Sequence, residues 1–150
     1  MTLGISHIII ETDSGFFGLK DDPAMAEELL RQWCGALGAD CLGMMFLGEE
    51  AVGSPAARAA DHAGSSGSAD CAVPIRRALT PLVYVPGADT MFWENSCASG
   101  SAATGMYLAA KAGSHVDVTL EEPAGILRVG SDPASGITVL HGSVRLRCCG

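Results

Sequence analysis

The spacing of apolar residues along the chain predicts a series of strands and two helices. Apolar, β-branched runs at 3–11 and 41–47 are typical of buried strands. Residues 115–122 alternate apolar and polar side chains, as a strand does when only one face is buried. We expect further strands at 78–85, 88–95, 124–129, 136–140 and 142–148. The first two of these are expected to form a hairpin with a turn at Pro86-Gly87.

Two segments carry the signals of helix ends. Asp22 and Pro23 predict the start of a helix that Gly38 ends. We expect it to pack on a sheet through an apolar stripe at helical spacing, made of Met25, Leu29, Leu30, Trp33 and Leu37. The second helix follows a turn at Ser96 and ends before Gly113. Its residues are small and apolar nearly all round, which is typical of an enclosed helix.

These elements predict an α+β fold in which a mostly antiparallel sheet wraps around the second helix. The segment 51–72 is rich in Ala, Gly and Ser, and we interpret it as a flexible surface loop because strands resume directly after it. We therefore expect the 150 residues to form a single domain, 1–150. The composition, 48% hydrophobic and 17% charged, is that of a globular chain.

The net charge and the absence of long apolar runs limit the kinds of partner and cellular location that we expect for this protein. A charge of −8 argues against a nucleic-acid-binding surface. The chain opens with no basic segment before an apolar stretch, and the apolar run at 8–10 is too short to cross a bilayer. We therefore expect a cytoplasmic protein without a membrane segment. Its cysteines are then mostly reduced, and their spacing predicts no metal site.

Cys97 is the strongest candidate for chemistry, because it lies where a strand stops and a helix starts. The N–H groups at a helix start bind anions, and a thiol placed there has a lowered pKa. A substrate carboxylate is expected to dock on the small residues that follow, Ser99, Gly100 and Ser101. Taken alone, such a cysteine is an acid/base for proton transfer, a nucleophile for acyl transfer, or an unreactive thiol. The remaining upstream cysteines, Cys34, Cys41 and Cys71, are interpreted as buried or incidental thiols.

Three segments, at 79–86, 93–102 and 122–129, are similar in sequence to one enzyme family. The most specific part of this similarity is the run Trp93-Glu94-Asn95-Ser96-Cys97. In this order the three segments resemble the C-terminal half of the histidine racemases of staphylopine-type metallophore biosynthesis. The segment at 43–46 is also similar to that half. The wider superfamily is similar to diaminopimelate epimerase and includes proline racemase. The segment at 4–7 weakly resembles the one that opens the second half of diaminopimelate epimerases, although its Asn and Pro are missing here.

The resemblance implies a racemase or epimerase that needs no cofactor and no metal. It implies two pseudo-symmetric domains, each a sheet around a central helix, and two catalytic cysteines that face the α-carbon of a free amino acid across a cleft. Histidine is the expected substrate. Cys97 matches one of the two cysteines, Ser99, Gly100 and Ser101 match the carboxylate site, and Glu94 and Asn95 match positions that orient the amino group or the side chain. His7 is either a site residue or a structural residue of its strand.

This chain departs from the family pattern because one whole half is absent, and with it the second catalytic cysteine. Three explanations stay open. The second half is a separate N-terminal-half chain, two copies form a homodimer, or the chain is a fragment or an inactive relative. We expect an isolated monomer to be inactive. The alternative function is a non-catalytic amino-acid-binding or assembly domain of the same fold.

Overall fold

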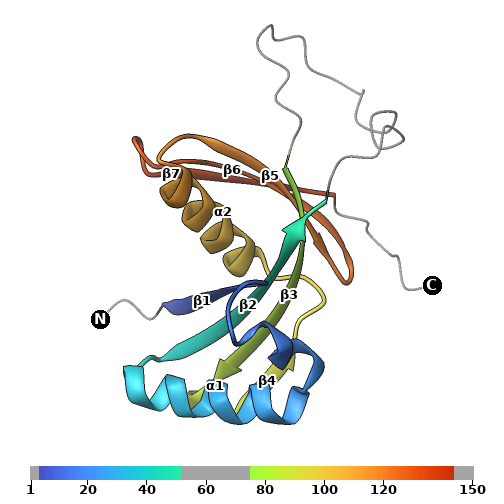
Figure 1. The fold of residues 1–150 in the computed structure, drawn as a ribbon. Coiled ribbons are helices and arrows are strands. Elements are labelled where there is room, and N and C mark those ends of the chain that lie inside the picture. Colours follow the sequence, from blue (N-terminus) through green and yellow to red (C-terminus); the bar gives the residue numbers. More distant parts are fainter. Residues whose placement is uncertain (1–3, 52–74, 144–150) are drawn as a thin grey trace, which may run out of the picture.

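The computed structural model of the protein describes residues 4–51 and 75–143. In this part of the chain seven strands form one sheet in the order β1-β2-β3-β5-β6-β7, and β4 also pairs with β3 (Figure 1). The strands are β1 (Ile5–Glu11), β2 (Cys41–Glu50), β3 (Ile75–Val85), β4 (Thr90–Trp93), β5 (Val116–Glu122), β6 (Gly125–Asp132) and β7 (Ile137–Gly142).

Two α-helices pack on this sheet, so the expected α+β class is confirmed. They are α1 (Pro23–Leu37) and α2 (Ala98–Ala112), accompanied by 3-10 turns η1 (Phe17–Asp21) and η3 (Pro86–Ala88). The sheet is mostly antiparallel, as expected, but it is mixed, because β1–β2 and β3–β5 pair in parallel. Each parallel pair is joined by a connection that contains a helix, as parallel neighbours require.

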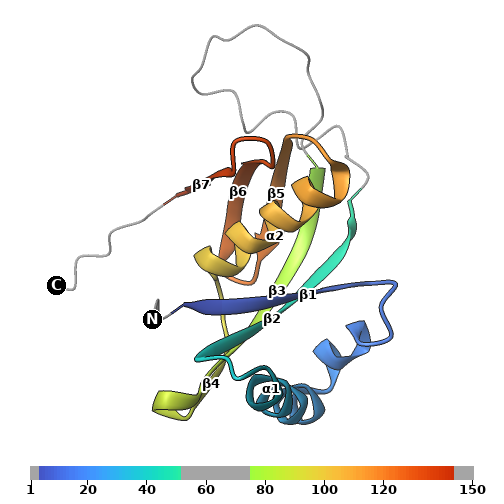
Figure 2. The same cartoon turned by 90° about the vertical axis from the view of Figure 1, so that its left-hand side faces the viewer.

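The two helices lie on opposite faces of the sheet. Successive side chains of a strand point to opposite faces, and those of β2 divide between two apolar clusters. Met45 packs in the cluster that contains Ala109 of α2, whereas Phe46 packs in the cluster that contains Leu30 of α1. The ribbon shows the same arrangement in two views, with α2 lying along the inner side of the curved sheet (Figures 1 and 2).

The ends of α1 lie where the sequence predicts them. The Asp22 side chain accepts a hydrogen bond from the N–H of Met25 at 3.2 Å, and Gly38 ends the helix with a φ of 61°. The expected buried stripe is partly wrong, because Met25 is 54% exposed and Leu37 is 64% exposed. The buried face is instead Ala26, Leu30 and Cys34. Two of these three residues are small, which lets the helix lie close to the sheet.

The second helix is covered on one side only, which corrects the expectation of an enclosed helix. Its buried positions are Gly100, Ser101, Thr104, Gly105 and Ala109, while Met106 on the other side is 53% exposed. A Cβ at Gly105 would collide with Val129 of β6, so the glycine permits the close approach of helix and sheet. In the described ranges the sheet therefore covers one side of α2, and the opposite side of the helix is exposed.

Some expectations fall outside the described residues. The loop expected at 51–72 does so apart from Ala51, as do Cys71 and most of the strand expected at 142–148. Within 4–51 and 75–143, no helix has the length and apolar character needed to cross a membrane.

Candidate active site

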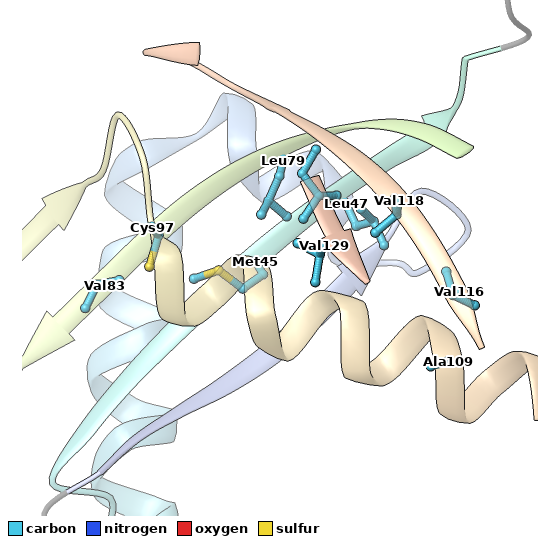
Figure 3. Packing of buried hydrophobic residues seen from close by; sticks show 10 residues of the cluster. Met45, Leu47, Leu79, Val83, Cys97, Ala109, Val116, Val118 and Val129 are labelled. Carbon is cyan, nitrogen blue, oxygen red and sulfur yellow. The ribbon is translucent and has the colours of Figure 1, made fainter. Parts of the chain in front are cut away.

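Cys97 is the N-cap residue of α2, in the position that the sequence predicts. The chain leaves β4, turns, and enters the helix at Ala98, and the Cys97 Sγ accepts a hydrogen bond from the N–H of Gly100 at 3.4 Å. Figure 3 shows the thiol at the start of the helix, beside Met45 and Val83. The residue is only 5% exposed. The sulfur is therefore a largely buried group that replaces the usual capping oxygen.

A buried carboxylate holds this turn in place. Glu122, at the end of β5, accepts a hydrogen bond from the backbone N–H of Cys97 at 3.0 Å and another from the Ser101 hydroxyl. It is 7% exposed. A negative charge at a helix start is stabilised by the unpaired N–H groups there. Glu122 thus fixes both the helix start and the backbone that carries the thiol.

The absence of a side chain at Gly100 brings the helix start onto β2. A Cβ at Gly100 would collide with the Met45 Sδ and would lie 3.1 Å from the Cys97 Sγ. Met45 is fully buried. The thiol therefore lies close to the buried, apolar Met45 side chain.

The structure brings His7 of β1 to the same site. The His7 Nε2 lies 3.2 Å from the Ser99 Oγ, and the Ser99 Oγ lies 3.6 Å from the Cys97 Sγ. The imidazole has room because residue 43, its partner on β2, is glycine, where a Cβ would lie 2.6 Å from the His7 Nδ1. His7 and Ser99, which are 92 positions apart in sequence, thus form with Cys97 a series of polar contacts that ends at the thiol.

The pKa of Cys97 is raised above its ordinary value, which corrects the expectation of a lowered pKa at a helix start. Burial is the largest cause, because it disfavours the charged thiolate, and the neighbouring Glu94 side chain raises the pKa further. The Ser99 hydroxyl and the Gly100 N–H lower it in part. Burial also lowers the pKa of His7, an effect that Glu94 offsets only partly.

The other expected site residues differ in how they lie. Glu94 is half-buried and close enough to both Cys97 and His7 to change their pKa values. Asn95 is exposed, and its backbone carbonyl accepts a hydrogen bond from the N–H of Ala124 at 2.8 Å. The Ser101 N–H donates to the Cys97 carbonyl at 2.8 Å and its hydroxyl donates to Glu122, so both groups are occupied within the chain.

Sequence reasoning missed Glu122 as a residue of the site. A signal was present, because the alternation in β5 places Val116, Val118 and Leu120 on the inner face, and Glu122 is two positions further on. An acidic residue on the buried face of a strand requires a partner. Without knowledge of the sheet order, the sequence does not identify that partner as the start of α2.

The described residues contain no cluster of side chains that could bind a metal ion. No three His, Cys, Asp or Glu side chains of residues 4–51 and 75–143 form a group suited to a metal ion. The polar groups around Cys97 are suited instead to proton transfer and to binding an anion.

Comparison with known proteins finds similarity to histidine racemase. The family description of the N-terminal domain of histidine racemase CntK matches residues 74–147, which include β3 to β7 and the Cys97 turn. A curated relative, the histidine racemase of Staphylococcus aureus (strain Mu50), is 37% identical over 57 residues, which are 37% of this chain and 21% of that protein. The chain is thus related to histidine racemase over about half its length, and it matches about a fifth of the curated relative.

The match also bears on which half of the enzyme the chain resembles. The matching family description is of the N-terminal domain, whereas the sequence resemblance indicated the C-terminal half. The two halves of such enzymes are expected to be pseudo-symmetric, so a cysteine followed by small residues and a helix start is not specific to either half. The comparison therefore corrects the assignment of the half and leaves the family likeness in place.

Proposed function

We propose that the chain is one half of a cofactor-independent amino-acid racemase or epimerase acting on histidine. The observation that carries the proposal is the Cys97 thiol at the start of α2, with Ser99 and Glu94 beside it. Its support is the match to the histidine racemase CntK N-terminal domain over the segment that contains this turn. As the family likeness implies, the D-amino acid produced serves metallophore biosynthesis.

In the proposed reaction the Cys97 thiolate removes the α-proton of the amino acid. The Cα–H bond breaks, an S–H bond forms, and the electron pair left on the α-carbon is delocalised into the substrate carboxylate. The first N–H groups of a helix have no partner within it, so those of Ala98 and Ser99 are available to the carboxylate as its negative charge grows. In this reaction Glu94 receives the α-ammonium group. Asn95 is exposed beside it and contacts the remainder of the substrate.

Inversion requires a second acid on the opposite face of the α-carbon. In the described residues Cys34 and Cys41 are the other cysteines. Cys34 is buried at the end of α1, with its Sγ 3.3 Å from the Ala39 carbonyl, on the sheet face opposite α2. We therefore propose that a second domain of this kind, in a separate chain or in a second copy, delivers a proton to the other face from its own thiol.

The experiment that tests this proposal is the interconversion of L- and D-histidine by the protein purified in its native assembly. We expect Cys97→Ser to abolish racemisation, because a hydroxyl at this position is too weak an acid to take part at neutral pH. The matched control is Cys34→Ser, which removes a thiol on the other face and is expected to leave racemisation intact. Undiminished racemisation by Cys97→Ser would refute the proposal.

A second candidate function is an amino-acid-binding domain without catalysis. The observation that favours it is the raised pKa of Cys97, because a thiol that stays protonated binds a substrate without removing its proton. This candidate predicts that titration calorimetry detects histidine binding that Cys97→Ser leaves unchanged. It predicts no racemisation by the wild-type protein in any assembly.

A further inference from the structure

The protonation state of Cys97 is set by the few polar groups that reach its buried sulfur. On α2 these are the Gly100 N–H at 3.4 Å and the Ser99 hydroxyl at 3.6 Å. From the turn before the helix, Glu94 faces the sulfur. From β2 the neighbour is the apolar Met45, and from β5 the Glu122 carboxylate is engaged by the backbone N–H of Cys97. Cys97 itself is only 5% exposed, although Ser99 is exposed and Glu94 is half-buried, so the polar groups that reach the sulfur affect the stability of its thiolate.

Among these groups the Ser99 hydroxyl has two neighbours, and their chemistry decides which way its hydrogen points. Its oxygen lies between the Cys97 Sγ and the His7 Nε2, at 3.6 Å and 3.2 Å. A hydroxyl carries one hydrogen and two lone pairs. If the imidazole donates to the hydroxyl oxygen, the hydroxyl hydrogen is free to be donated to the sulfur.

The surroundings of His7 fix the imidazole as the donor. Its Nδ1 is buried and has no hydrogen-bond partner among the described residues, and it lies against the backbone of Gly43. A buried N–H without an acceptor costs more than a buried lone pair. The proton of the neutral ring therefore sits on Nε2, which faces Ser99. Burial lowers the pKa of His7, although Glu94 opposes this, and so favours the neutral ring, because the charged form would need a second N–H at the buried Nδ1.

We propose that Ser99 is a positioning residue whose hydroxyl, oriented by the Nε2–H of His7, donates a hydrogen bond to Cys97 Sγ and stabilises its thiolate. The inference rests on the proposed function, which is why a thiolate is needed at this position. It adds a role for a side chain, since the carboxylate site uses only the backbone N–H of Ser99. Glu94 acts in the opposite direction, because its negative charge beside the sulfur favours the neutral thiol.

The directions in which the neighbours shift the pKa of Cys97 agree with this arrangement. Ser99 lowers the pKa, Glu94 raises it, and burial raises it most. Replacing Ser99 and replacing Glu94 should therefore change thiol reactivity in opposite directions. A residue that only supports the fold would not produce such a pair of shifts.

The experiment is the pH profile of Cys97 alkylation by iodoacetamide in the full chain, measured without substrate. Trypsin releases residues 78–111 as one peptide in which Cys97 is the only cysteine, so mass spectrometry follows this thiol separately from the other five. Because a hydrogen bond to a charged group is lost, we expect Ser99→Ala to slow alkylation about tenfold at neutral pH and to shift the profile to higher pH. Glu94→Gln is expected to speed alkylation and to shift the profile to lower pH.

Two controls make the result specific to the hydroxyl. Ser99→Thr retains a hydroxyl and is expected to restore the wild-type profile. Ser96→Ala removes an exposed hydroxyl from the same turn and should leave the profile unchanged. Identical profiles for Ser99→Ala and wild type, or for Ser99→Ala and Ser99→Thr, would overturn the inference. The alkylation profile needs no turnover, so the inference and the proposed function can fail separately. If only the proposed function fails, Ser99→Ala still shifts the alkylation profile while the protein does not racemise histidine.

Discussion

At the scale of single residues, Cys97 occupies a position that serves the backbone as well as the proposed chemistry. Its sulfur caps α2, and its N–H is held by Glu122. Residue types and spacing are enough to identify Cys97, Ser99 and Gly100 as candidates. They do not reveal that burial raises the pKa of the thiol, because burial depends on Met45 and on strands distant in sequence.

The close contact between Gly100 and Met45 leads to a prediction about stability. Gly100→Ala places a methyl group against the Met45 side chain, which is fully buried, and we expect it to destabilise the protein by about 1–3 kcal/mol. Gly35→Ala is the matched control, because Gly35 is also helical and a Cβ there meets nothing within 4 Å. The control is expected to stabilise by about 0.5–1 kcal/mol, as alanine does in an open helical position. Urea unfolding of the two variants measures both changes, and a stabilising Gly100→Ala would contradict the described packing.

At the scale of elements, an ion cluster joins the far end of α2 to two strands. Glu11, at the end of β1, accepts hydrogen bonds from Arg77 of β3 at 3.1 Å, from the Tyr107 hydroxyl at 2.8 Å, and from Lys111. The contact with Lys111 is the largest of the causes that lower the pKa of Glu11 to about 2 from its ordinary 4.5. The cluster holds one end of the helix and Glu122 holds the other, so α2 is fixed at both ends.

This cluster predicts how stability depends on pH. A carboxyl whose pKa is lowered by folding stabilises the protein above its unfolded pKa, and that stabilisation is lost as the pH falls from about 4.5 to about 2. The Glu11 side chain is 14% exposed, and we expect Glu11→Gln to cost about 2 kcal/mol at neutral pH and almost nothing below pH ~2.

Urea unfolding at a series of pH values checks this prediction. The matched control is Glu121→Gln, which removes a pair with Arg76 whose carboxyl side is 46% exposed. Exposed pairs contribute at most about 1 kcal/mol, so this control should show a small change at every pH. A cost of Glu11→Gln that is equal at neutral and at acid pH would show that the charge of Glu11 is not the cause.

The elements themselves were largely predictable because their end signals are local. The Asp22 cap and Gly38 mark α1, and Gly113 ends α2 in the left-handed conformation, with a φ of 66°. Strand pairing was not predictable to the same extent. The parallel β1–β2 and β3–β5 pairs depend on where α1 and α2 carry the chain, which the alternation of side chains within one strand does not record.

At the scale of the whole molecule, the described residues form a curved sheet with α2 along its inner side, and the turn that carries Cys97 lies at the N-terminal end of this helix (Figures 1 and 2). In the proposed reaction the substrate must reach both Cys97, at the start of this helix, and a second acid. The sequence resemblance indicated the C-terminal half, and the cysteine with the small residues after it does not by itself identify the half. The comparison with the N-terminal domain of histidine racemase CntK supplied that information.

The measurement that tests the central claim most directly is the exchange of the α-hydrogen of histidine with deuterium from solvent. Proton NMR follows the α-hydrogen signal while the protein, in its native assembly, is incubated with L-histidine in deuterium oxide. We predict that the signal decays with the wild-type protein and persists with Cys97→Ser, because in the proposed reaction the Cys97 sulfur removes the proton. Decay at an equal rate with both proteins, or no decay with either, would contradict the claim that this thiol performs proton transfer.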